Sequence, residues 1–172
     1  MTIGTKGKSF EKIYEVVNHE LSHASHFSKV GDSFWAKYVS YIMSYGAYGD
    51  GTGRNAELCA IGEMWGYAMG CIAEKEIQGA PIVVNKFPYL PIDGWIKPHI
   101  FGDLYSANTL NKKQIFDCLG SSVQTYEELT EEMVYDPVGS EEYGSPRYVT
   151  YTTKSHGYYT MKYPDDVCCW YE

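Results

Sequence analysis

The 172-residue sequence has no long apolar run and no block of basic residues. A helix that crosses a bilayer needs roughly 20 consecutive, predominantly apolar residues, so we expect no membrane-spanning segment. Lys and Arg total 14 against 22 Asp and Glu, which gives a net charge of −8. A chain this acidic, without a basic cluster, has no electrostatic attraction for nucleic acid or for an anionic membrane surface.

The cysteines exclude a complete disulfide framework. The five cysteines are odd in number and contain no Cys-x-x-Cys pair, so they cannot form a complete disulfide framework. Cys59 and Cys71 lie in an apolar helical pattern, which predicts buried free thiols rather than metal ligands or redox groups. The adjacent Cys168 and Cys169 indicate no particular role.

The first nine residues lack the apolar segment of a signal peptide. The length and the 44% hydrophobic content suit one domain, for which we expect residues 1–136. Residues 137–172 are rich in tyrosine and are expected to form a tail that packs on this domain. Because a predicted helix begins so close to the N-terminus, we expect upstream sequence in the natural gene product. The acidic, tyrosine-rich composition favours an exported or surface-attached protein.

Helical periodicity dominates the first 78 residues. Residues 9–29 carry apolar side chains at helical spacing after Ser9, a candidate N-cap. Residues 33–45 and 54–78 show the same periodicity, and four glycines between residues 46 and 53 predict an irregular loop. The core face of the first helix is expected to consist of Phe10, Ile13, Val16, Val17, Ala24 and Phe27.

The second half of the chain predicts shorter elements. Four prolines between residues 80 and 99 favour irregular backbone there. Short helices are expected over residues 109–120 and after Thr125, where Thr125 and Glu128 have the spacing of a capping box. The predicted fold is therefore mainly α. An α+β arrangement arises if the β-prone tail segments form a hairpin, which we expect over residues 147–153 and 158–163.

The most informative motif is His19-Glu20-Leu21-Ser22-His23, an HExxH sequence inside the first predicted helix. Residues four apart on a helix lie on one face. His19 and His23 can therefore direct two imidazoles at one Zn²⁺ ion, while Glu20 reaches a metal-bound water. This arrangement is typical of zinc-dependent peptide hydrolysis, although HExxH also occurs by chance on exposed helices.

A catalytic zinc site needs a third protein ligand. His26 lies seven residues after His19, about 10.5 Å further along the helix axis. One helix cannot wrap three imidazoles spaced in this way around a single ion. The sequence therefore predicts that His26 lies outside the ligand set, as a residue that supports a ligand or lines the cleft.

A carboxylate on the helix predicted over residues 54–78 is a better third ligand. Glu57 and Glu63 lie six residues apart, so only one of them can face the metal. Glu57 heads an apolar face, where a carboxylate is costly to bury unless it is paired or bound to metal. Glu63 heads a more polar face. This contrast favours Glu57 as the ligand and leaves Glu63 as the alternative near the site. Three glycines on this helix are expected to let another helix approach closely, namely Gly62, Gly66 and Gly70.

The HExxH motif with a downstream helical Glu resembles the gluzincin metallopeptidases. The likeness is closer to the catalytic domain of the anthrax lethal factor-like peptidases, which carry a Tyr-Gly before an Asn and a Glu-x-x-Ala helix. Here Tyr48-Gly49 precedes Asn55 and the run Glu57-Leu58-Cys59-Ala60. The resemblance covers residues 9–75.

The resemblance implies a Zn²⁺ ion held by His19, His23 and Glu57. It also implies that Glu20 acts as general base and that Tyr48 donates a hydrogen bond to the developing oxyanion. Tyr45 and, more remotely, His99 are alternatives to Tyr48. Gluzincins place a β-sheet before the HExxH helix, whereas little sequence precedes it here. The sheet would be absent, replaced by the C-terminal hairpin, or supplied by upstream sequence.

Three functions are compatible with this pattern. The first is a zinc metallopeptidase that acts on peptides or proteins. The second is a catalytically inactive zincin-like domain that binds a peptide or a partner, and the third is a structural helical module with an accidental HExxH. The presence of Glu20 favours the first over the second, because an inactive relative commonly loses its general base.

Overall fold

The computed structural model describes residues 4–46, 48–79 and 95–134, together with the backbone of three short strands between residues 148 and 169. The described part of the chain is mainly helical, which confirms the predicted mainly α class. Its helices in chain order are α1 (Phe10–Val30), α2 (Asp32–Tyr45), α3 (Ala56–Gln78), α4 (His99–Ser106), α5 (Lys112–Asp117) and α6 (Tyr126–Val134).

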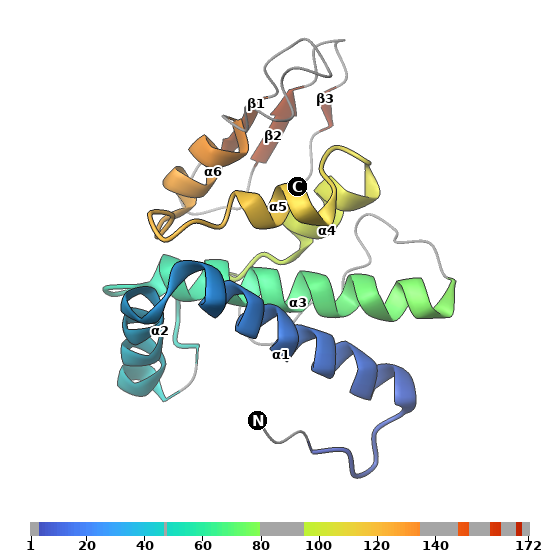
Figure 1. Cartoon of the computed structure of the whole chain (residues 1–172). Helices are drawn as coiled ribbons and strands as arrows, with labels where there is room; N and C mark the ends of the chain where they lie inside the picture. Colours follow the sequence, from blue (N-terminus) through green and yellow to red (C-terminus); the bar gives the residue numbers. More distant parts are fainter. Residues whose placement is uncertain are drawn as a thin grey trace.

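The strands form one antiparallel sheet in the order β1-β2-β3. They are β1 (Tyr148–Tyr151), β2 (Tyr159–Lys162) and β3 (Cys168–Cys169). Tyr148 pairs with Lys162, and Met161 pairs with Cys169. The sheet lies beside α6, whereas α1 packs on α3 and α2 (Figure 1).

Capping hydrogen bonds from nearby side chains fix the starts of two predicted helices. The Ser9 side chain accepts a hydrogen bond from the backbone N–H of Lys12, as expected of an N-cap. Before α6, the Thr125 hydroxyl accepts from the Glu128 N–H and the Glu128 carboxylate accepts from the Thr125 N–H. This reciprocal pair confirms the predicted capping box.

Helix α3 lies at the centre of the fold, with α1 across one side and α4 and α5 on another (Figure 1). Nearly every side chain from Ala56 to Ile72 is buried, Cys59 and Cys71 among them as free thiols, as predicted. The described residues from 95 to 134 supply most of the remaining core. Their buried apolar side chains include Phe101, Leu104, Ile115, Leu119, Val123 and Leu129.

Glycines in α3 allow α1 to pack very closely. A Cβ atom at Gly70 would lie 2.8 Å from the carbonyl oxygen of Glu15, which is closer than real Cβ atoms come to backbone. A Cβ at Gly62 would lie 3.4 Å from the Tyr38 ring of α2. The predicted role of the glycines, to admit a neighbouring helix, is thus confirmed. The Trp65 indole also donates to the carbonyl oxygen of Ser22 at 3.0 Å, which ties α3 to α1.

The predicted core face of α1 is wrong. Phe10 is 64% exposed and Phe27 is 45% exposed, whereas the buried residues of α1 are Ser22, His26 and Val30. The face that carries the histidines is the one that packs on α3, because small residues on α3 accept the imidazoles there. Apolar periodicity alone therefore assigned the wrong side of this helix to the core.

Other expectations have mixed outcomes. Helix α4 (His99–Ser106) was not predicted, and α5 is shorter than the helix expected over residues 109–120. The irregular segment at 80–94, the boundary at residue 136 and the side chains of the tail lie outside the described residues.

None of the helices in the described part has both the length and the apolar character to cross a bilayer.

The glycine contacts predict different responses to alanine at two positions of α3. Gly70→Ala should destabilise the protein by about 1–3 kcal/mol, because the added Cβ meets backbone that cannot move without separating α1 from α3. Gly62→Ala should stay within about 1 kcal/mol of wild type, since the Tyr38 ring can shift and alanine has the higher helix propensity. Urea unfolding of both variants measures this, and equal losses would contradict the tight α1–α3 contact.

Candidate metal centre

Two helices bring three candidate metal ligands together. His19 and His23 lie one turn apart on α1, and Glu63 lies on the facing side of α3. One ligand atom from each residue lies within 4.8 Å of the other two. Glu63 is only 1% exposed, whereas the imidazoles are half-buried, so the carboxylate is enclosed while the histidines reach solvent.

The distances within the cluster suit a single small cation. The two Nε2 atoms of His19 and His23 are 2.9 Å apart. His23 Nε2 lies 3.4 Å from Glu63 Oε1, and His19 Nε2 lies 3.7 Å from Glu63 Oε2. Bonds of about 2.0–2.1 Å at tetrahedral angles would place ligand atoms roughly 3.3 Å apart. The three residues could therefore hold a metal ion with little movement.

Glu57, the carboxylate favoured by the sequence, lies elsewhere. Its Oε2 atom accepts a hydrogen bond from the backbone N–H of Tyr126 at 2.8 Å, beside the start of α6. Glu63 takes the position facing the imidazoles. The correction has a physical cause: the side of α3 that looked polar, with Glu63, Tyr67 and Gly70, is the side covered by α1.

Gly66 makes room for the two imidazoles. A Cβ atom there would lie 2.9 Å from Cε1 of His23 and 3.0 Å from Cε1 of His19. Gly66 follows Glu63 by three residues and so lies on the same face of α3, one turn further on. Any side chain at this position would push the imidazoles away from the carboxylate. The glycine is thus part of the site and not only of the helix packing.

Tyr38 of α2 holds the carboxylate. Its hydroxyl donates a hydrogen bond to Glu63 Oε1. Burial favours a raised pKa for Glu63, but interactions with His23 and then the Tyr38 hydrogen bond outweigh it and hold this pKa below its ordinary value. The other oxygen, Oε2, is buried and makes no hydrogen bond within the described residues. A buried carboxylate with one oxygen that accepts no hydrogen bond from the described residues is suited to a cation.

The charge state of His19 suits metal binding. Burial, followed by the charge of the neighbouring His23, lowers the pKa of His19 to about 4. At neutral pH the imidazole is therefore uncharged, which is the form that coordinates a metal. The ring also packs edge-on against Tyr67, with the centroids 4.3 Å apart.

Tyr48 lies beside this cluster. Its hydroxyl is 3.5 Å from the hydroxyl of Tyr67, and its backbone carbonyl accepts a hydrogen bond from Tyr41 at 2.9 Å. Burial, followed by the charge of Glu63, raises the pKa of Tyr48, so its hydroxyl keeps its proton and can donate. Tyr45, an alternative, instead packs against Tyr41 with centroids 4.7 Å apart.

Of the remaining predicted site residues, Glu20 is next to a ligand of the cluster in sequence, whereas His99 is not part of the cluster. Glu20 is half-buried on α1, adjacent to His19 in sequence and three residues before His23. His99 begins α4 and is not part of the ligand cluster found among the described residues. Tyr38 and Tyr67 were not singled out by the sequence, because aromatic residues in an apolar helical pattern do not differ from ordinary core residues.

His26 is completely buried and lies outside the cluster of His19, His23 and Glu63, and among the described residues it makes no hydrogen bond that would support a ligand. Its ring packs against Phe34 and Trp35 of α2, with centroid distances of 4.9 and 5.9 Å. Neither ring nitrogen makes a hydrogen bond within the described residues. Burial lowers the pKa of His26 from 6.5 to about 4, so the imidazole packs as a neutral group between α1 and α2.

Comparison of the chain with protein-family models, curated proteins and solved structures finds no match.

The geometry predicts which glutamate supports metal binding. After addition of zinc and dialysis, elemental analysis should find about one zinc per wild-type chain and much less in Glu63→Gln, which removes the buried charged ligand. Glu57→Gln is the matched control, because its amide oxygen can still accept from the Tyr126 N–H. Loss of zinc in Glu57→Gln but not in Glu63→Gln would contradict the assignment.

The buried imidazole of His26 predicts loss of stability in acid. The folded protein keeps His26 neutral down to pH about 4, whereas the unfolded chain takes up the proton near pH 6.5. Protonation therefore favours the unfolded state, and stability falls as the pH drops through this window. His26→Leu should show a smaller fall than wild type in urea unfolding between pH 7 and pH 5, with a chelator present. An equal fall in both proteins would contradict this effect.

Proposed function

We propose that the protein is a zinc-dependent metallopeptidase whose metal ligands are His19, His23 and Glu63. The observation that carries this proposal is the convergence of an HExxH helix and a buried carboxylate on one point, at distances suited to a single ion. An accidental HExxH on a structural helix has no reason to be matched by a glycine that admits both imidazoles. The proposal keeps the resemblance to gluzincins but changes the third ligand.

The donor set and its surroundings favour zinc. Imidazole nitrogens suit several first-row metals, and two His with one carboxylate leave a position open for substrate or water. What favours zinc among these metals is the glutamate beside the first ligand, since zinc peptidases need a general base there. Zinc bound here would polarise a peptide carbonyl and lower the pKa of a water molecule.

The chain's own residues would carry the proton and the developing charge. Glu20 would accept a proton from the attacking water and pass it to the leaving amine. Tyr48, whose hydroxyl stays protonated, would donate a hydrogen bond to the carbonyl oxygen as negative charge develops. Tyr38 would keep Glu63 ionised and oriented through its hydrogen bond. Each of these groups touches or adjoins the proposed ligand set.

The role of Glu20 can be separated from metal binding. Glu20→Gln should retain about one zinc per chain, because Glu20 is not among the clustered ligands. It should reduce peptide hydrolysis at least about 100-fold, since general-base catalysis contributes roughly 10²–10⁴-fold. Zinc content and cleavage of an unfolded protein substrate are measured on the same samples.

A second result would distinguish the inactive alternative. If wild type binds zinc but neither wild type nor Glu20→Gln cleaves any substrate, the domain is a metal-containing binding module. Equal cleavage by both proteins would remove Glu20 from the mechanism. Glu57→Gln serves as the control for a lost carboxylate, and it should cleave like wild type.

A further inference from the structure

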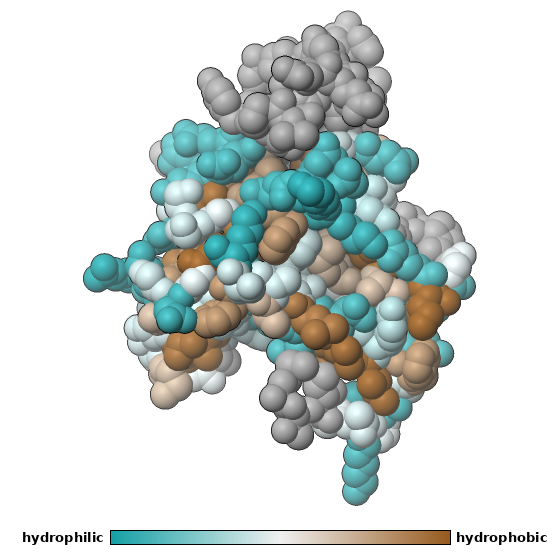
Figure 2. All heavy atoms as spheres, in the orientation of Figure 1, coloured by the Kyte–Doolittle hydropathy of each residue, from teal (hydrophilic) through white to brown (hydrophobic). Residues whose placement is uncertain are grey.

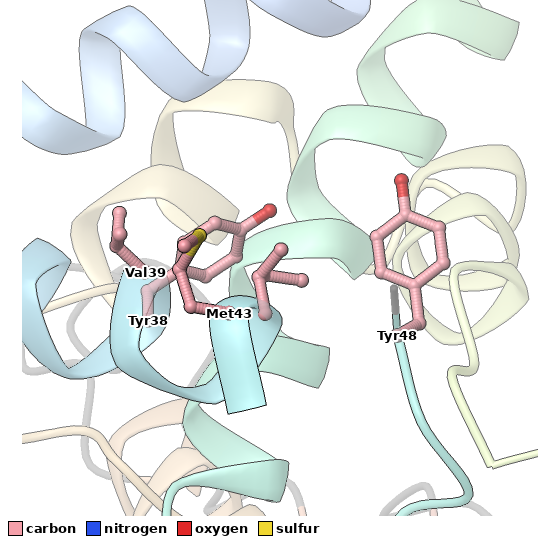
Figure 3. A pocket seen from close by; sticks show the side chains of 5 residues that line it. Tyr38, Val39, Met43 and Tyr48 are labelled. Carbon is pink, nitrogen blue, oxygen red and sulfur yellow. The ribbon is translucent and has the colours of Figure 1, made fainter. Parts of the chain in front are cut away.

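A pocket of about 400 Å³ lies in the wall formed by α2 and the segment that follows it. Figure 3 shows Tyr48 facing Tyr38, Val39 and Met43 of α2 across this pocket, and Ile42 completes the lining. Three of the five lining side chains are aliphatic or thioether groups, and none is charged. Its volume lies within the range of pockets that bind small ligands, so it can hold a large side chain.

Two of the lining residues also contact the proposed metal centre. The Tyr38 ring lines the pocket while its hydroxyl donates to Glu63. The Tyr48 ring lines the opposite side, and its hydroxyl lies 3.5 Å from that of Tyr67, whose ring packs on His19. The inner wall of the pocket therefore consists of the two tyrosines that adjoin the metal ligands. A molecule bound at the metal would have this pocket beside it.

The outer wall of the pocket is apolar and exposed. Met43 is 77% exposed and Val39 is 52% exposed, although both are apolar side chains. Figure 2 shows hydrophobic atoms reaching the surface over α1 and α2. Exposed apolar surface next to a cavity favours a binding role over an accidental one.

We propose that this pocket receives an apolar side chain of the peptide substrate, next to the bond that is cleaved. The inference rests on the proposed peptidase function, because a peptide held at the metal centre brings its neighbouring side chains to Tyr38 and Tyr48. Leucine, methionine and phenylalanine fit the uncharged lining. Aspartate and lysine would lose hydration there without gaining a partner.

Selection of peptides by the full-length chain tests this proposal. Zinc-loaded Glu20→Gln protein is immobilised and exposed to a pool of random peptides, and the retained peptides are sequenced by mass spectrometry. The same pool is digested with wild type, and the cleavage sites are read in the same way. One position next to the cleaved bond should be enriched at least about tenfold in Leu, Met or Phe over Asp, as expected of an apolar subsite.

A charge placed in the pocket should change this preference. Met43→Lys should shift the enriched position toward Asp and Glu, and Val39→Lys provides a second variant of the same kind. Ile77→Lys is the matched control, because Ile77 is 46% exposed at the far end of α3 and gains the same charge. Its selection should equal that of the parent protein. Circular dichroism and zinc content are compared across all variants.

The outcomes separate the pocket from the catalytic proposal. Cleavage without apolar enrichment, or with a preference that both lysine variants leave unchanged, would overturn the pocket assignment and leave the peptidase function intact. Apolar enrichment among retained peptides that the lysine variants reverse, with no cleavage by wild type, would support the pocket and overturn the peptidase function. Neither retention nor cleavage would overturn both.

Discussion

The close contact between α1 and α3 is the constraint on which the rest of the structure depends. At Gly70 the backbone of α1 fits only because α3 has no side chain there, and at Gly66 the two imidazoles occupy the space that a side chain would fill. Helices with larger residues at the contact lie further apart. At a larger separation, His19 and His23 would not reach Glu63. The same short distance between α1 and α3 is therefore required both for packing of the core and for bringing the three candidate ligands together.

This contact has an electrostatic consequence. It buries a carboxylate with one oxygen held by Tyr38, while the other lies 3.7 Å from His19 Nε2 and makes no hydrogen bond within the described residues. Burial of a charge in this way costs free energy unless a cation or further donors compensate. The neutral His19 imidazole beside it supplies a lone pair and no positive charge. A bound cation would compensate Glu63, so metal binding and folding stability are expected to be linked.

Local sequence signals predicted α1, α2, α3 and α6, whereas the choice between the two candidate glutamates depends on long-range packing. Ser9 and the Thr125–Glu128 pair mark helix starts because capping needs only residues within one turn. The choice between Glu57 and Glu63 depends on which side of α3 meets α1. The sequence cannot decide this from polarity, because α3 is buried nearly all around. The sequence pattern of a glutamate followed three positions later by a small residue pointed to Glu57, which precedes Ala60. The same pattern is also present at Glu63, which precedes Gly66.

Helix α2 connects the ligands to the proposed substrate pocket. Phe34 and Tyr41 are each 2% exposed and anchor this helix in the fold, while Val39 and Met43 remain at the surface. Tyr38 lies between these two sets and faces Glu63. The residues that position α2 are therefore distinct from those that line the outer pocket. Such a separation lets the outer pocket residues change with little effect on the metal ligands, because the anchors and Tyr38 fix the geometry at Glu63. The substrate selectivity of the proposed peptidase could then vary while its proposed metal ligands keep their positions.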